Sequence, residues 1–153
     1  MIKSIRILLS IAAHMDYEIW QMDFKTAFFN GCLDETIYMV QPEGFIAKGE
    51  ENKVCKLQKS IYGPKQTSRS WNIKFDQSVK SFGFIHCPDE PCLYKRSNKN
   101  VMVFLILYVD DILLIENDVG TLSSVKVWLS TQFDMKDLGE ANHILRIKLM
   151  RDR

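Results

Sequence analysis

The segment that most restricts the fold spans residues 101–116 and reads VMVFLILYVDDILLIE. Nine apolar or aromatic residues come first, then Asp110 and Asp111, and then four more apolar residues. Because positions of both parities are apolar, residues 101–109 are predicted to form a strand that is buried on both faces of a sheet. Residues 112–116 are predicted to return as a second strand, which places the two aspartates at the tip of a hairpin.

Two adjacent carboxylates at such a tip point to a cation. Neighbouring strand residues face opposite sides of a sheet, but aspartates in a tight turn can converge. Two unit charges ~4 Å apart repel by roughly 4 kcal/mol at an effective dielectric of 20. A divalent ion with oxygen ligands relieves this repulsion, and Mg²⁺ typically binds one or two carboxylates together with substrate phosphates. The alternative is a solvated hairpin turn that binds nothing.

A third carboxylate is predicted to join this pair. Residues 17–24, YEIWQMDF, alternate between a core face and a partly polar face that carries Asp23. If this strand lies beside the hairpin, Asp23 approaches Asp110 and Asp111. Three carboxylates can hold two metal ions ~3.5–4 Å apart and can serve an in-line phosphoryl displacement.

The remaining pattern predicts an α+β fold. The order strand, helix, strand, strand, helix, strand is typical of a split β-α-β (ferredoxin-like) antiparallel sheet with helices on one face. The other face of the sheet is then free to meet a ligand, and the chain is expected to form one domain over residues 1–153. Besides the segments above, the predicted elements are helices over about 4–14, 65–82 and 120–132, a closing strand over 143–150, and a short strand near TIYMV within an irregular stretch from 30 to 58.

Composition narrows the functional classes only slightly. The net charge of +1 predicts no partner, whereas residues 53–80 carry seven cations and one anion, a local net charge of +6. That segment is compatible with phosphate binding, although a solvated helix face is the favoured interpretation. No segment approaches the ~20 apolar residues of a membrane span. His86, Cys87 and Cys92 form an incomplete zinc motif, so free thiols are favoured.

Several motifs resemble one enzyme family, and together they cover essentially the whole chain. The tetrapeptide YVDD (108–111) in an apolar hairpin resembles the catalytic signature of reverse transcriptases. The chain is similar to the copia-type retrotransposon branch in particular. The segments that carry this resemblance are QMDFKTAFFNG (21–31), IYMVQPEGF (37–45), VCKLQKSIYGPKQTSRSW (54–71) and FDMKDLGE (133–140).

The resemblance implies a polymerase palm that performs RNA-directed DNA synthesis with two Mg²⁺ ions, or with Mn²⁺ in their place. It implies Asp23, Asp110 and Asp111 as catalytic metal ligands, with the Phe24 carbonyl as an addition. The implied partners are an RNA or DNA template-primer, a dNTP and the remainder of a retrotransposon polyprotein, with no membrane involved. The implied location is intracellular, in a cytoplasmic particle of the element.

The resemblance also assigns roles beyond the metal ligands. Phe28 is the implied steric gate against a ribose 2′-OH, with Phe29 as the competing residue. Lys136 matches a position proposed to protonate the departing pyrophosphate, and an exposed loop lysine is the equally weighted alternative. The remaining assignments are Tyr62, Gly63 and Lys65 for the nucleotide pocket, and Tyr108, Val109, Arg69 and Arg146 for primer or template contact.

Some positions depart from the family pattern without removing a metal ligand. Pro64 replaces a leucine, Thr67 and Ser68 replace an Ala-Pro pair, and Arg146 replaces a glycine in the implied primer-grip strand. Because the fingers segment and thumb of the family have no counterpart in residues 1–153, the domain is expected to be an incomplete palm. Phosphoryl transfer depends on positioning, so the chain alone is expected to polymerise little or nothing.

Two further functional classes remain open from the sequence. A non-catalytic nucleic-acid-binding module of ferredoxin-like fold would bind RNA without metal, through exposed aromatic residues. A structural or interaction protein would have Asp23, Asp110 and Asp111 far apart, with carboxyl groups well beyond the ~8 Å that two ions could bridge.

Overall fold

The computed structural model describes residues 2–30, 35–61, 65–98, 100–144 and 147–150. The chain divides into two compact units, one of residues 1–26 with 76–153 and one of residues 27–75. The helices are α1 (Ile2–His14), α2 (Lys65–Ser81) and α3 (Val119–Gln132), with a 3₁₀ helix, η1 (Ala27–Asn30). The strands are β1 (Glu18–Phe24), β2 (Tyr38–Val40), β3 (Val54–Lys56), β4 (Ile85–His86), β5 (Leu93–Asn98), β6 (Val101–Tyr108), β7 (Asp111–Glu116), β8 (Met135–Glu140), β9 (His143–Ile144) and β10 (Ile147–Lys148).

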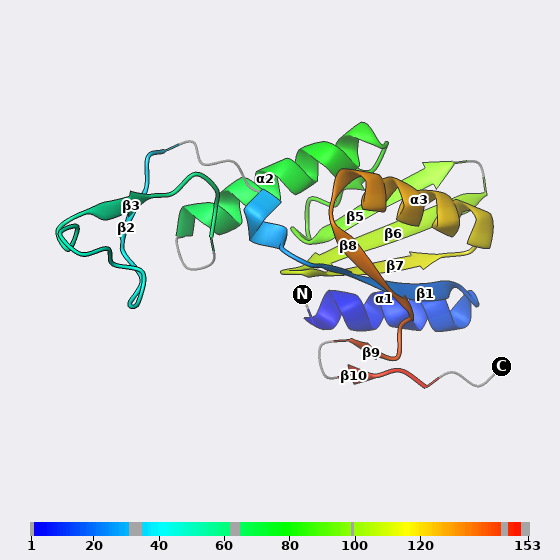
Figure 1. The fold of residues 1–153 in the computed structure, drawn as a ribbon. Coiled ribbons are helices and arrows are strands. Elements are labelled where there is room, and N and C mark those ends of the chain that lie inside the picture. Colours follow the sequence, from blue (N-terminus) through cyan, green and yellow to red (C-terminus); the bar gives the residue numbers. More distant parts are fainter. Residues whose placement is uncertain (1, 31–34, 62–64, 99, 145–146, 151–153) are drawn as a thin grey trace. The chain divides into compact units, whose positions relative to one another are not determined.

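The first unit is built on a six-stranded sheet in the order β4-β5-β6-β7-β1-β8 (Figure 1). Every neighbouring pair of strands in this sheet is antiparallel. Strand β6 lies inside the sheet, and Leu105, Ile106 and Leu107 are all buried, because both of its faces are covered. The predicted hairpin of β6 and β7, and its pairing with β1, are therefore confirmed.

Helices cover both faces of this sheet. Helix α1 packs Ile5, Leu8 and Ala12 against a cluster that includes Ile106 of β6 and Leu113 of β7. Figure 1 shows α1 and α3 on opposite sides of the sheet. The expectation that the helices share one face is therefore wrong for α1. Its buried stripe at helical spacing needs an apolar partner, and the odd-numbered residues of β7 provide it.

Helix α3 lies on the other face. It buries Leu122, Val125 and Leu129, and it begins at the N-cap residue Asp118, whose carboxylate accepts a hydrogen bond from the Thr121 N–H at 2.7 Å. The segment after α2 joins the same layer, because the Phe82 and Trp128 rings stack with centroids 4.2 Å apart.

The C-terminal part of the sheet differs from the expectation. The predicted closing strand over 143–150 is instead the two short antiparallel strands β9 and β10, and β8 is the sixth strand of the sheet. Strand β8 is an edge strand with the sequence MKDLGE and mostly exposed side chains, so it lacks the apolar alternation that indicates a strand. Strands β4 and β5 were also missed, since the solvent-facing part of β5, KRSN, is polar.

The second unit contains η1, the β2–β3 hairpin and the first part of α2. Strands β2 and β3 pair Tyr38 with Lys56 and Val40 with Val54. The α2 stripe predicted from the sequence is present here, where the rings of Trp71 and Phe75 lie 5.7 Å apart.

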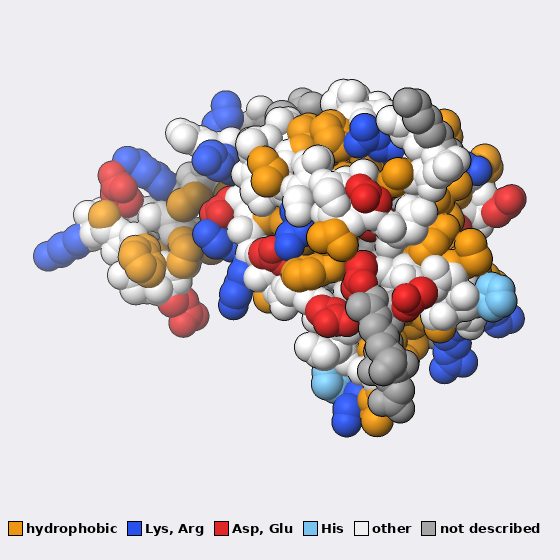
Figure 2. Space-filling view, turned by 90° about the vertical axis from the view of Figure 1, so that its right-hand side faces the viewer, with side chains coloured by type: hydrophobic (Ala, Val, Ile, Leu, Met, Phe, Trp, Pro, Cys, Tyr) orange, Lys and Arg blue, Asp and Glu red, His pale blue; other side chains and the backbone are white. Residues whose placement is uncertain are grey.

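Charge is mixed rather than segregated on the face that Figure 2 shows. Figure 2 shows one face on which acidic and basic side chains are interspersed with hydrophobic ones. In the described part of the chain, no helix is both long and apolar enough to span a membrane.

Candidate active site

A two-residue turn joins β6 to β7 and carries the first carboxylates. Tyr108 pairs with Asp111, which leaves Val109 and Asp110 as the loop. Val109 has a φ of 54°, which is rare for a β-branched residue, and its side chain is exposed. A positive φ at the first loop residue matches the right-handed twist of the flanking strands. The turn therefore takes Asp110 out of the flat strand geometry, while Asp111 is the first residue of β7.

Strand β1 brings the third carboxylate to this turn. Asp23 is the register partner of Asp111 in the antiparallel pair of β1 and β7. Directly opposite residues in such a pair have Cβ atoms about 4.5–5.5 Å apart. The Phe24 N–H also donates to the Asp110 carbonyl oxygen at 2.8 Å, which ties the end of β1 to the turn. The far-apart arrangement expected of a purely structural protein is therefore not found for Asp23 and Asp111.

The electrostatics show that the charges converge. The pKa of Asp23 is raised above its ordinary value, first by burial and then by the negative charges of Asp111 and Asp110. Lys136, the register partner of Asp23 on β8, lowers the pKa of Asp23. All four groups thus act on one region at this end of β1, as repulsion between like charges and attraction by Lys136 require.

A neutral side chain also reaches the cluster. The Gln21 Nε2 donates to Oδ1 of Asp111 at 3.0 Å. Gln21 precedes Asp23 by two residues and so lies on the same face of β1. Gln21 is the first residue of the motif over 21–31, and strand parity places it on the face of Asp23, but the resemblance assigns it no role. Gln21 and Asp111 line a pocket together with apolar residues that include Ile106 and Ile144.

The donor set suits a hard divalent cation, because carboxylate oxygens that repel one another are the ligands such an ion stabilises. In the described ranges, however, no group of three or more His, Cys, Asp or Glu side chains is placed to hold a metal ion. The metal assignment therefore stays a prediction. Cys55, Cys87 and Cys92 are free thiols, and Cys32 lies outside the described residues.

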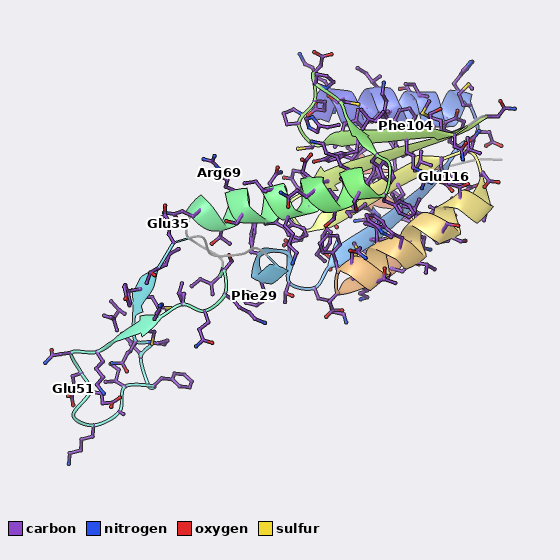
Figure 3. The ribbon with its side chains drawn as sticks, turned by 90° about the horizontal axis from the view of Figure 1, so that it is seen from above. Phe29, Glu35, Glu51, Arg69, Phe104 and Glu116 are labelled. Atoms are coloured by element: carbon purple, nitrogen blue, oxygen red, sulfur yellow. The ribbon has the colours of Figure 1, made fainter. Side chains whose placement is uncertain are left out.

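Other predicted site residues are only partly described. Phe24 is buried, and its ring meets that of Phe133 edge-on with centroids 5.3 Å apart. Phe28, Phe29 and Arg69 belong to the second unit, and Figure 3 shows the Arg69 side chain projecting outward from α2. Their roles, and the choice between Phe28 and Phe29, stay predictions. Tyr62, Gly63 and Arg146 lie outside the described residues, as does the side chain of Lys65.

A further carboxylate in β7 lies apart from the site. Glu116 ends this strand, is fully buried, and is labelled in Figure 3. Neither of its carboxylate oxygens has a hydrogen-bond partner in the described part of the chain. Burial raises the pKa of Glu116 to about 7, with a smaller contribution from the charge of Asp118 and an opposing one from the nearby Leu122 N–H. Glu116 therefore keeps its proton to a higher pH than an ordinary glutamate does.

Comparison with known proteins agrees with these motifs. Residues 1–153 match the family described as reverse transcriptase (RNA-dependent DNA polymerase). A Pol polyprotein from the transposon TNT 1-94 of Nicotiana tabacum is 50% identical over 151 residues, which are 98% of this chain and 11% of that protein. The corresponding polyprotein from the transposon RE1 of Arabidopsis thaliana is 37% identical over 148 residues, which are 97% of this chain and 10% of that protein.

The chain spans about a tenth of the length of these curated relatives. No solved structure matches it. The family match covers every residue, and both relatives are retrovirus-related Pol polyproteins of transposons, so the resemblance to the copia-type branch is confirmed. The chain belongs to the reverse transcriptase (RNA-dependent DNA polymerase) family, in its copia-type retrotransposon branch.

Proposed function

We propose that this chain is the palm of an RNA-directed DNA polymerase, in which Asp23, Asp110 and Asp111 bind the divalent ions of nucleotidyl transfer. The observation that carries this proposal is the register of β1 and β7, which sets Asp23 opposite Asp111 beside the turn that holds Asp110. The strands β6, β7, β1 and β8 lie side by side in that order, as expected for a split β-α-β palm.

The chain's own residues would bind and orient the reactants. Asp23, Asp110 and Asp111 would hold two Mg²⁺ ions, and Mn²⁺ is the alternative; the Phe24 carbonyl is a further candidate ligand. When bound, such ions stabilise both the attacking and the leaving oxygen of an in-line phosphoryl displacement. The carboxylates would hold these ions against the primer 3′-OH and the dNTP triphosphate.

Lys136 has a separate proposed role. It is exposed on β8 and lies across from Asp23, so its ammonium group can reach a phosphate held near the carboxylates. We propose that it donates a proton to the departing pyrophosphate, as a general acid must lie within hydrogen-bond reach of the oxygen it protonates. Val109, exposed at the turn, is the proposed contact for the primer end.

The test is the effect of Mg²⁺ on primer-template binding. Fluorescence anisotropy of a labelled RNA–DNA primer-template, with dNTP present, is measured with Mg²⁺ and with EDTA. We expect binding that strengthens with Mg²⁺ in the wild-type chain and loses this dependence in Asp110→Asn. RNA binding that needs no metal and is unchanged by Asp110→Asn would contradict the proposal and favour a non-catalytic binding module.

A further inference from the structure

Gln21, to which the family resemblance assigns no role, contacts the carboxylate cluster directly. The Gln21 side chain donates from Nε2 to Oδ1 of Asp111 at 3.0 Å, between strands β1 and β7. In the register of these strands Gln21 lies opposite Leu113, so it reaches one step diagonally to Asp111. Diagonal neighbours on one face of a sheet are within reach of a long side chain such as glutamine.

This hydrogen bond opposes the electrostatic repulsion between Asp23 and Asp111 that the strand register creates. Asp23 lies directly opposite Asp111, and like charges directly opposite each other destabilise a sheet and drive the two side chains apart. A hydrogen bond to one oxygen of Asp111 fixes that carboxylate against the repulsion. A carboxylate has about four acceptor positions, so one hydrogen bond leaves capacity to bind an ion.

The surroundings of Gln21 restrict where its amide can go. Gln21 and Asp111 line the same pocket as Ile5 and Ile106, and both polar side chains are half-buried. Hydrogen bonds to a charged acceptor in such partly dry surroundings are stronger than those between neutral groups in water. The amide is therefore held on Asp111 rather than released to solvent.

We infer that Gln21 is a positioning residue, which orients the Asp111 carboxylate so that it can share a divalent ion with Asp23. This inference rests on the proposed function. Groups that hydrogen-bond to a metal ligand fix its orientation, and their loss typically weakens metal binding about 10- to 100-fold. Gln21 itself need not touch the ion or the substrate.

The first experiment detects the contact without metal. In ¹⁵N NMR spectra of the full 153-residue chain, the side-chain amide signals of Gln21 should shift in Asp111→Asn. Those of Gln132, which is exposed on α3, should stay in place. Gln21 signals that do not move in Asp111→Asn would overturn the inference, because the hydrogen bond would then be absent in solution.

The second experiment measures the consequence for metal. Gln21→Met keeps the length and shape of the side chain but removes the donor, and Gln132→Met is the matched control. Mn²⁺ binding is followed by electron paramagnetic resonance, and urea unfolding checks that both variants remain folded. We expect the dissociation constant for Mn²⁺ to rise about tenfold in Gln21→Met and to stay unchanged in Gln132→Met.

Two possible results distinguish a failure of the Gln21 inference from a failure of the proposed metal site. Mn²⁺ binding that is lost in Asp23→Asn but unaffected by Gln21→Met would overturn only the positioning role. Mn²⁺ binding that is indifferent to Asp23→Asn would overturn the metal assignment, and the role of Gln21 with it.

Discussion

Each end of β7 carries a carboxylate, and the two carboxylates differ in exposure and in hydrogen bonding. Asp111 begins the strand, is partly exposed, and accepts a hydrogen bond from Gln21. Glu116 ends the strand and is fully buried, with no hydrogen-bond partner for either oxygen in the described part of the chain. Five residues apart in one strand, the two side chains point to opposite faces of the sheet.

The difference teaches that the surroundings of an acidic residue in an apolar strand decide whether it is a candidate ligand. At Asp111, the register adds Asp23, and the turn adds Asp110. At Glu116, the register places Val103 of β6 and Glu18 of β1 opposite, and burial is the main reason that the pKa of Glu116 rises to about 7. The Asp111 end brings together negative charges that a cation can stabilise, whereas burial at the other end disfavours the charged form of Glu116.

The largest expected effect is a change in stability on substitution of Glu116, the buried carboxylate at the end of β7. The pKa of Glu116 rises from 4.5 to about 7 on folding, so this group leaves stability intact below pH 4.5 and lowers it as the pH rises to about 7. Glu116→Gln removes the charge, so it should stabilise the chain by about 3 kcal/mol at pH 8 and by almost nothing at pH 4. Urea unfolding at both pH values measures the difference. Equal effects at the two pH values would mean that folding does not raise the pKa of Glu116.

The second effect is a loss of metal binding on substitution of Asp111, at the start of β7. Asp111→Asn should weaken Mn²⁺ binding by roughly a hundredfold, about 2.7 kcal/mol, because it removes a charged ligand. The same measurement on Glu116→Gln should show wild-type affinity. If both variants bind Mn²⁺ equally, the two ends of β7 do not differ in function, and the comparison fails.

The turn at the site end should also respond to glycine. Val109 has a φ of 54°, a conformation that costs a β-branched residue about 1–3 kcal/mol and that glycine adopts freely. Because the Val109 side chain is 52% exposed, little apolar burial is lost on its removal. Val109→Gly should therefore raise the free energy of unfolding by about 1 kcal/mol. A loss of stability in urea unfolding would show that Val109 is not strained.

The smallest expected effect is a shift in the pKa of Glu116 on substitution of Asp118. Asp118 raises the pKa of Glu116 through its charge, and it also caps α3. Asp118→Asn keeps an acceptor at the cap, so it should move the pH midpoint of the Glu116-dependent stability change to lower pH. The midpoint is read from urea unfolding across pH 4–9, with Asp89→Asn, in the exposed β4–β5 turn, as the control. A midpoint that does not move assigns the shift to burial alone.

Much of the candidate site was readable from residue patterns. The apolar run on both parities placed β6 inside the sheet, and the Asp pair marked its turn. The alternation in the sequence of β1 placed Asp23 on the partly polar face of that strand. The contact of Gln21 was not predicted, because a single strand shows only the face on which a residue lies and not the partner that it reaches.

The fold was predictable where the elements are strongly apolar and was missed where they are not. Helices α1, α2 and α3 lie within one or two residues of the predicted ranges. Strand β8 escaped prediction because an edge strand pairs on one side only and needs no apolar alternation. The side of the sheet on which α1 packs was also not predicted. The sequence of a helix reveals that it has an apolar face, but not which face of the sheet that apolar face will cover.

The sequence by itself determined the family, the hairpin and the identity of the three carboxylates, because local periodicity and motif order carry that information. Only the tertiary structure decided that Asp23 faces Asp111, that Gln21 reaches across to it, and that Glu116 is sealed away from water. Those facts depend on strand register and on burial, which are set by contacts between residues about 90 positions apart or between separate layers. No local pattern of residues encodes such contacts directly.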